Sequence, residues 1–286
     1  MPGYDSTGQV VLVSPYDTTF GSPGASDDKS SVAAMVETAR ALGAKPLRND
    51  IVMIFTDGEE PGLLGASSYV AEHANSGQGG GPVLNWEATG NAGPAVLFET
   101  SAGNAELIKE FGTAAELPIG DSALAALYQA GNQNTDFMVF KNAGFVGLNF
   151  ALMDGTAAYH NSVDTAARLD RAGLQHMGPN MLRPTRELAD RDLASLRSSD
   201  DAVFFTIFRQ LITLSELAGL AAGWSGDCDH GGFGCAGATS ERSDHSWDTG
   251  RGRSSAVADH HGAAGRDRPV AAADHGPAGI CDAAYG

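Results

Sequence analysis

Short apolar runs rich in β-branched residues alternate with stretches of helical periodicity along residues 9 to 222. The apolar runs predict buried strands at Gln9–Ser14, Asp50–Thr56, Pro82–Trp86, Ala95–Glu99 and Phe145–Phe150. The helical pattern predicts helices at Ser30–Leu42, Leu63–Glu72, Asn104–Ala114 and Asp136–Asn142. Strands that alternate with helices predict an α/β sandwich with a mostly parallel sheet, whose ligands bind at the carboxyl ends of the strands.

The composition changes sharply near residue 222. The 64 residues from Gly223 onward hold 13 of the 37 glycines, all three cysteines and five of the eight histidines. A segment so poor in core-forming residues is predicted to be disordered. The alternative is a metal-binding array, because Asp-His pairs recur every 15 residues and Cys228 and Cys235 lie nearby. We therefore assign residues 1–200 to the folded domain and residues 223–286 to a tail rich in Gly, Asp and His.

Charge and hydropathy exclude several classes of partner. The formal net charge is -17, so the chain lacks the basic face that nucleic-acid binding needs. No signal peptide is recognisable in the chain as given. Residues 201–222 are apolar but include Arg209, Gln210 and Glu216, which favours an amphipathic helix, or the approach to a membrane span, over a span itself. Membrane contact is expected only through segments absent or incomplete here, and the cellular location is left open.

Acidic side chains follow several of the predicted strands. Asp27 and Asp28 come after the first strand, where either could simply cap the next helix. Asp57, Glu59 and Glu60 follow the most apolar strand, where a helix dipole could favour them. Three carboxylates within four residues repel one another, however, unless they share a cation or a proton.

Two further features complete this group. Glu87 comes at the end of the third strand, and Tyr159-His160 lies in the loop after the fifth. A single loop histidine is often a solvated surface group. Together, however, Asp, Glu and His are the oxygen and nitrogen ligands that suit zinc, with one carboxylate left for acid–base chemistry. The residues therefore predict metal-assisted hydrolysis.

These motifs resemble those of the co-catalytic zinc aminopeptidases, within the branch of vacuolar-type membrane proteases. The resemblance spans about Gly8 to Leu193 and is carried by Tyr16-Asp17, Gly24-Ala25-Ser26-Asp27-Asp28, Phe55 to Gly65, Leu84-Asn85-Trp86-Glu87, Asn134-Thr135-Asp136-Phe137 and Tyr159 to Thr165. It implies a three-layer, zinc-exopeptidase-like sandwich, with helices on both faces of a mostly parallel central sheet. It also implies an aminopeptidase that acts on peptides with a free N-terminus.

The resemblance implies a ligand set as well. Asp27 would bridge two zinc ions, Glu60 and His160 would complete one metal site, and Glu87 would ligate the other ion. Glu59 would be the general base.

Other groups would surround these ligands. Tyr159 would help to hold the oxyanion of the tetrahedral intermediate. The peptide bond between Asp27 and Asp28 would be cis. Three further aspartates would support the ligands: Asp17, Asp136 and Asp164.

One departure from the family pattern falls at position 15, where a histidine ligand is expected and this chain has proline. Proline offers no side-chain donor atom to a metal. The first metal site then keeps only Asp27 and Glu87, and Asp17 loses the histidine that it would support. We expect one zinc ion instead of the two in the intact family pattern, and a peptidase activity impaired by Pro15.

The front of the chain departs from the pattern too. Only 13 residues precede Ser14-Pro15, where the family fold has further strands and a helix. We therefore expect an N-terminally shortened fragment whose Gln9–Ser14 strand lies at an unpaired sheet edge. Two alternatives to the aminopeptidase stay open. One is a single-zinc acyltransferase like the glutaminyl cyclases, and the other is an inactive remnant or non-catalytic binding domain.

Overall fold

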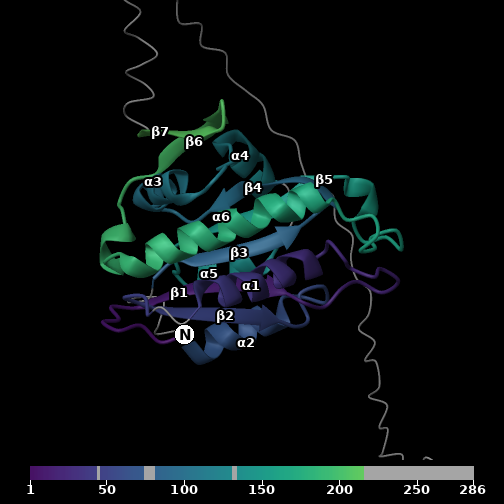
Figure 1. Cartoon of the computed structure of the whole chain (residues 1–286), viewed down its shortest axis with the longest axis horizontal. Coiled ribbons are helices and arrows are strands. Elements are labelled where there is room, and N and C mark those ends of the chain that lie inside the picture. The colour runs from purple at the N-terminus through teal and green to yellow at the C-terminus, as the bar shows by residue number, and fades with distance from the viewer. Residues whose placement is uncertain (44–45, 74–80, 131–133, 216–286) are drawn as a thin grey trace, which may run out of the picture. The chain divides into compact units, whose positions relative to one another are not determined.

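The computed structural model describes residues 1–43, 46–73, 81–130 and 134–215, which contain a five-stranded sheet with helices on both faces (Figure 1). The strands are β1 (Gln9–Pro15), β2 (Asp50–Thr56), β3 (Val83–Ala88), β4 (Ala92–Thr100) and β5 (Gly147–Asp154). Their order is β2-β1-β3-β5-β4, and every neighbouring pair is parallel except β4 and β5. The predicted α/β sandwich with a mostly parallel central sheet is confirmed.

Helices form a layer on each face of this sheet (Figure 1). On one face, α1 (Lys29–Leu42) and α3 (Ala105–Ala114) both pack against α6 (Arg171–Asp190). On the other face, α2 (Leu64–His73) packs against α5 (Asp136–Asn142). A further helix, α4 (Ser122–Ala130), lies against β4, and Thr156–Ala158 and Leu193–Leu196 are short 3₁₀ turns. The four predicted helices begin and end within one residue of their predicted limits.

β1 supplies side chains to two hydrophobic cores. Because successive side chains of a strand point to opposite faces, Val10 and Leu12 lie in the larger core with α1, α3 and α6. Val11 and Val13 lie in the smaller core with α2 and α5. A run of consecutive apolar residues is thus what a strand covered on both faces requires.

The two faces of β3 and β5 differ in polarity. Trp86 is fully buried in the larger core and stacks on Phe150, with 4.2 Å between ring centroids. The alternate residues Asn85, Glu87 and Asn149 are buried on the opposite face, under α5. A polar layer therefore lies inside the sandwich, next to the carboxyl ends of the strands.

α6 runs through a segment for which the sequence predicts no helix. Pro179 and Pro184 both lie inside it, and each removes a backbone donor and crowds the preceding turn. The helix nevertheless buries Met177, Met181 and Leu188 in the larger core. Tertiary packing across the sheet outweighs the local cost of the two prolines.

Residues 202–215 form an antiparallel hairpin, which corrects the helix predicted for residues 201–222. Its strands are β6 (Ala202–Ile207) and β7 (Gln210–Ser215). Ala202 and Phe204 are buried while Val203 is exposed, so the period of burial is two residues and not the 3.6 of a helix. The apolar segment therefore packs against α3 and α4 as a hairpin.

The rest of that predicted helix, residues 216–222, and the predicted tail, residues 223–286, lie outside the described residues. The helices that the structure does describe include none long and apolar enough to cross a membrane.

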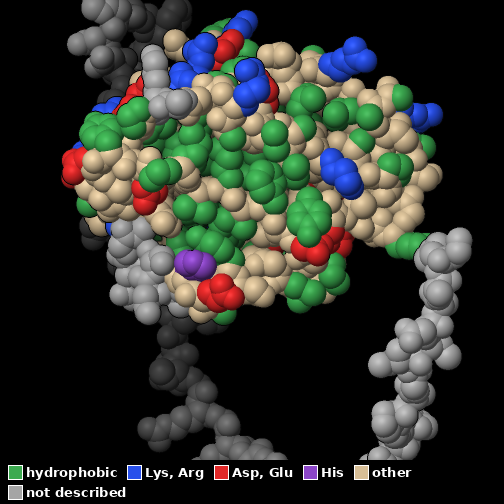
Figure 2. All heavy atoms as spheres, turned by 60° about the horizontal axis from the view of Figure 1, so that its bottom comes forward, with side chains coloured by type: hydrophobic (Ala, Val, Ile, Leu, Met, Phe, Trp, Pro, Cys, Tyr) green, Lys and Arg blue, Asp and Glu red, His purple; other side chains and the backbone are tan. Residues whose placement is uncertain are grey.

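The two edge strands of the sheet are β2 and β4, so the prediction that β1 is an edge strand is wrong. β1 pairs with β2 on one side and with β3 on the other. Figure 2 brings the β2 edge forward and shows hydrophobic side chains gathered on that face. Phe55 of β2 is 40% exposed, and Val52, Met53 and Ile54 are partly exposed.

Candidate metal centre

Three side chains from three separate loops meet at the carboxyl end of the sheet. Asp27 lies just before α1, Glu60 between β2 and α2, and His160 just after the 3₁₀ turn at residues 156–158. The Nε2 atom of His160 lies 3.2 Å from Glu60 Oε2 and 3.4 Å from Asp27 Oδ2. Each of the three residues offers one atom that could bind a metal ion, and these three atoms lie within 4.8 Å of one another.

The geometry of this group fits a zinc ion. Ligands about 2.0–2.1 Å from a tetrahedral zinc lie roughly 3.3 Å from one another, which matches both distances to His160. Asp27 Oδ2 is buried and has no hydrogen-bond partner among the described residues, so it is an acceptor suited to a cation. Burial and the nearby Glu60 raise the pKa of Asp27 to about 7, which shows how poorly the cluster tolerates another negative charge.

Asp17 holds the loop that carries the two glutamates. Its carboxylate accepts hydrogen bonds from the backbone N–H groups of Glu59, at 3.1 Å, and Glu60, at 3.3 Å. The backbone N–H of Thr19 donates to Glu60 Oε1 at 2.9 Å. The sequence predicts that Asp17 lacks a histidine to support, because proline stands at position 15. In the structure Asp17 still contacts the centre, because it orients the backbone of Glu59 and Glu60.

Asp164 holds the loop that carries Asp27. Its carboxylate accepts hydrogen bonds from the backbone N–H of Ser26, at 2.9 and 3.1 Å, and from that of Asp27, at 3.1 Å. The peptide bond between Asp27 and Asp28 is cis, as the resemblance implies. Asp28 immediately precedes α1, but its side chain makes no capping hydrogen bond, so helix capping does not explain its presence.

A second side of the centre is formed by Asp28 and Glu87, and Pro15 lies at the end of β1, the strand next to β3, which carries Glu87. Glu87 is 4% exposed, and its Oε1 atom accepts a hydrogen bond from Asn85 Nδ2 at 2.6 Å. The carboxyl groups of Glu87 and Asp28 are hydrogen-bonded to each other. Burial raises the pKa of Glu87 to about 8 and that of Asp28 well above its ordinary range. This side offers carboxylates but no nitrogen ligand, because proline stands at position 15.

Glu59 lies between the two sides. Burial and repulsion from Glu87 and Asp136 raise the pKa of Glu59 to about 9. Asp136, at the start of α5, accepts a hydrogen bond from the Thr56 hydroxyl, and burial raises its pKa to about 6. A buried carboxylate with a raised pKa beside a candidate metal site has the properties of a proton-transfer group.

Tyr159 covers the outer side of the centre. Its ring stacks on the ring of His160, with 3.8 Å between centroids and 22° between planes. Burial, together with repulsion from Asp27 and Glu59, raises the pKa of the Tyr159 hydroxyl. The phenol therefore stays protonated near neutral pH and can donate a hydrogen bond.

Sequence reasoning missed a set of buried polar residues that begins beside Glu87. Asn85 and Asn149 look like interruptions of apolar strands, and that interruption is the signal that could have marked them. Their contacts reach two charged side chains that also escaped notice, Glu99 and Lys141.

Comparison with protein families and curated proteins gives consistent matches. The model of "Peptidase family M28" matches residues 1–184. The chain is 29% identical to endoplasmic reticulum metallopeptidase 1 of Rattus norvegicus over 69% of its own length. It is 32% identical to the vacuolar membrane protease of Yarrowia lipolytica over 65% of its own length. The chain spans only 23% and 19% of the length of these two relatives.

Two solved structures share the fold. The zinc aminopeptidase BSAP from Bacillus subtilis matches with a TM-score of 0.50 and 24% identity, over 63% of this chain and 46% of that one. The LapA aminopeptidase of Legionella pneumophila matches with a TM-score of 0.53 and 17% identity, over 66% of this chain and 52% of that one. Likeness at these identities establishes the arrangement of strands and helices and not the chemistry of the site.

Proposed function

The chain belongs to peptidase family M28, and this membership supports metallopeptidase activity. We propose that the chain is a zinc-dependent aminopeptidase. Its substrate is a peptide with a free N-terminus, from which it removes the first residue. The observation that carries the proposal is the group formed by Asp27, Glu60 and His160, with Glu59 beside it.

These three residues would hold one zinc ion. When bound, zinc lowers the pKa of a coordinated water molecule and polarises the substrate carbonyl. Three protein ligands leave a coordination position open, as catalytic zinc sites require. The side with Glu87 and Asp28 lacks a nitrogen ligand, so the proposal is for one tightly bound ion and not two.

Glu59 is the proposed general base. It takes a proton from the attacking water and returns a proton to the amine that leaves when the peptide bond breaks. The pKa of about 9 belongs to the metal-free protein, in which Glu59 holds its proton near neutral pH. A zinc ion nearby would lower that pKa and leave the carboxylate free to accept a proton. The Tyr159 hydroxyl donates a hydrogen bond to the oxygen on which negative charge develops.

Glu87 is the proposed partner of the substrate's free amine. Its buried carboxylate has no cationic neighbour among the residues named at the centre, and an α-ammonium group would supply one. Such a contact would restrict the enzyme to the first residue of a peptide, since only that residue carries the charge.

Hydrolysis of leucine p-nitroanilide by the full chain, loaded with one equivalent of zinc, tests the proposal. Glu59→Gln should lower kcat by at least about 100-fold while zinc content stays unchanged, because proton transfer is lost and the ligands remain. The matched control is Glu72→Gln, which neutralises an exposed glutamate of α2 and should leave kcat unchanged.

Other outcomes would support the alternatives. Activity that survives both Glu59→Gln and removal of zinc by a chelator would overturn the proposal. Cyclisation of an N-terminal glutaminyl peptide without anilide hydrolysis would indicate the single-zinc acyltransferase. Zinc binding without either reaction would indicate a non-catalytic domain.

A further inference from the structure

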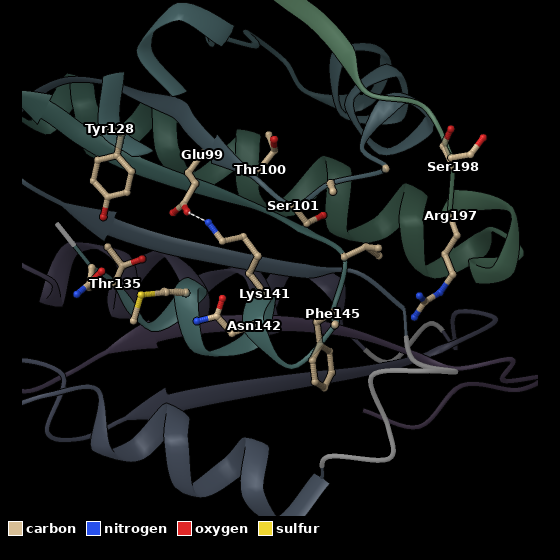
Figure 3. Close-up of a pocket in the computed structure, with 17 residues that line it drawn as sticks. Glu99, Thr100, Ser101, Tyr128, Thr135, Lys141, Asn142, Phe145, Arg197 and Ser198 are labelled. Atoms are coloured by element: carbon tan, nitrogen blue, oxygen red, sulfur yellow. Dashed lines mark hydrogen bonds and ion pairs between the residues drawn. The ribbon is translucent and has the colours of Figure 1, made fainter. Parts of the chain in front are cut away.

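Three side chains connect Glu87 to the ammonium group of Lys141 in α5. Asn85 Nδ2 donates to Glu87 Oε1 at 2.6 Å and to Asn149 Oδ1 at 2.9 Å. Asn149 Nδ2 donates to Glu99 Oε2 at 3.0 Å. Lys141 Nζ donates to Glu99 Oε1, as Figure 3 shows. The series runs without interruption from a side chain of the centre to an ammonium group.

The backbone of three neighbouring strands places these groups together. Asn85 of β3 lies directly across from Asn149 of β5 in the parallel register. A register shift between Leu97 and Glu99 of β4 interrupts the alternation of that strand. Leu97 therefore faces the larger core, whereas Glu99, two residues later, reaches Asn149 on the opposite face.

Every group in the series is buried except its last member. Asn85 and Asn149 are 0% exposed and Glu99 is 3% exposed. The side chain of Lys141 is 26% exposed and lines a cavity of about 920 Å³ between α5 and β4 (Figure 3). Burial of a carboxylate and two amides lowers the stability of the fold unless their hydrogen bonds are made. Apolar side chains could fill the same space without this requirement.

The series has a direction that Lys141 imposes. The Lys141 ammonium group beside Glu99 favours the ionised carboxylate, which can only accept hydrogen bonds. The amide of Asn149 must then turn its NH₂ toward Glu99 and its oxygen toward Asn85. Asn85 in turn must present its NH₂ to Glu87. The Thr135 hydroxyl also accepts from Asn149 Nδ2, at 2.8 Å, but a hydroxyl can donate as well as accept. The ionised Glu99 beside Lys141 is therefore the group that decides that Glu87 meets a donor and not an amide oxygen.

We propose that Lys141 and Glu99 are positioning residues for Glu87, acting through the orientation of the Asn149 and Asn85 amides. The inference rests on the proposed function only for the role of Glu87 in binding the substrate amine. The amide relay itself, defined as Asn85, Asn149, Glu99 and Lys141, is a property of the fold and can be tested without catalysis.

The relay is tested first by NMR of the full chain. The side-chain NH₂ signals of Asn85 and Asn149 are assigned by replacing each asparagine in turn. Lys141→Met should shift the Asn85 signals, although two residues lie between them along the relay. The control is Lys109→Met, which removes an exposed lysine paired with Glu106 three residues earlier and should leave them unchanged. Unchanged Asn85 signals in a folded Lys141→Met protein would overturn the relay.

A second variant covers the case in which Lys141→Met leaves Glu99 buried without its partner and the protein unfolds. Lys141→Met with Glu99→Gln removes the buried charge as well. A glutamine amide can turn either way, so the orientation of Asn149 is no longer imposed. The Asn85 signals should again shift or broaden, and signals identical to those of the parent chain would contradict the proposal.

The consequence for Glu87 is tested by kinetics on leucine p-nitroanilide. Lys141→Met should lower kcat/KM by about tenfold, mostly through KM, because the amine-binding carboxylate is misplaced and Glu59 is untouched. Lys141→Arg should restore most of the loss, since arginine also only donates. A loss confined to kcat, or no rescue by arginine, would indicate a merely structural ion pair. If the parent chain has no peptidase activity, the proposed function fails, and the NMR result alone decides the relay.

Discussion

The candidate metal centre has two halves that differ in one kind of side chain. The His160 half, formed by Asp27, Glu60 and His160, brings two carboxylates and a ring nitrogen within 4.8 Å of one another. The Pro15 half, formed by Pro15, Asp28 and Glu87, brings together two carboxyl groups that share a hydrogen bond. Both halves are built at the same ends of parallel strands. The presence of a nitrogen donor is what separates a candidate zinc site from a pair of acids.

The backbone explains why proline is accepted at position 15. The N–H of Tyr16 donates to the carbonyl of Thr56 in β2, so the nitrogen one residue earlier points toward β3. The pairing of β1 with β3 ends at Val13 and Asn85, before that point. Proline has no N–H to extend that pairing, but the pairing of β1 with β2 continues through Pro15 and Thr56. A ligand position can be lost here without disturbing the fold.

Loss of the ring nitrogen from the His160 half should have the largest effect. His160→Ala should weaken zinc binding by more than about 100-fold, because losing a group that only supports a ligand already costs 10–100-fold. Isothermal titration against a competing chelator measures the change. His73→Ala, in α2, is the control and should bind like the parent chain. Unchanged affinity in His160→Ala would mean that zinc binds elsewhere.

Addition of a ring nitrogen to the Pro15 half is the converse change. Pro15→His should raise the metal content from one zinc per chain to two, because a nitrogen donor joins Glu87 and Asp27. Pro15→Ala, which restores the backbone N–H but adds no ligand, should stay at one. Elemental analysis after dialysis measures both. Two zinc ions in the parent chain would show that the halves do not differ in this way.

Removal of the charge that orients the glutamates should have a smaller effect. Asp17→Asn should weaken zinc binding by about tenfold, since one acceptor for the N–H groups of Glu59 and Glu60 is replaced by a donor. Asp5→Asn, at an exposed aspartate of the N-terminal segment, is the matched control. Equal affinities in the two variants would remove Asp17 from the centre.

The smallest effect concerns pH and stability. In the metal-free protein the pKa values of Asp27, Glu87 and Glu59 are raised to about 7, 8 and 9. The unfolded chain releases these protons near pH 4, so the folded state holds more protons between about pH 4 and 9. Stability should therefore fall as pH rises through this range.

Zinc should reduce this dependence without abolishing it. The ion takes the place of the proton on Asp27 in the His160 half, while Glu87 in the Pro15 half keeps its raised pKa. Thermal unfolding from pH 5 to pH 9, with and without zinc, measures the difference. Glu87→Gln should flatten the slope that remains with zinc bound. Identical slopes with and without zinc would contradict the assignment of Asp27 as a ligand.

Much of the centre could be predicted because parallel topology forces strand ends together. Glu60 and Glu87 follow separate strands, and the alternation of strands and helices already places their ends at one edge. The distance of either residue from His160 required the fold. The relay could not be predicted at all, because it depends on β3 lying next to β5 and on the shift within β4. Strand order and bulges leave no clear mark in a single sequence.

The incorrect helix at residues 201–222 has a local cause. The hairpin turns at Phe208 and Arg209, whose φ angles are 46° and 69°. Two consecutive positive φ values are typical of a type I′ turn, which usually contains Asn-Gly or Asp-Gly. With a bulky pair at the turn, the usual signal is missing, and an apolar run of this length resembles a helix.

Trp86 can report by its fluorescence on β3, the strand that carries Glu87. Its indole is fully buried against Phe150, and its Nε1 atom has no hydrogen-bond partner among the described residues. An indole in such surroundings fluoresces at a shorter wavelength than one in water. It is also the residue immediately before Glu87. The chain also contains Trp224 and Trp247, so in a variant that lacks those two the emission wavelength would report whether the strand that carries Glu87 is in place.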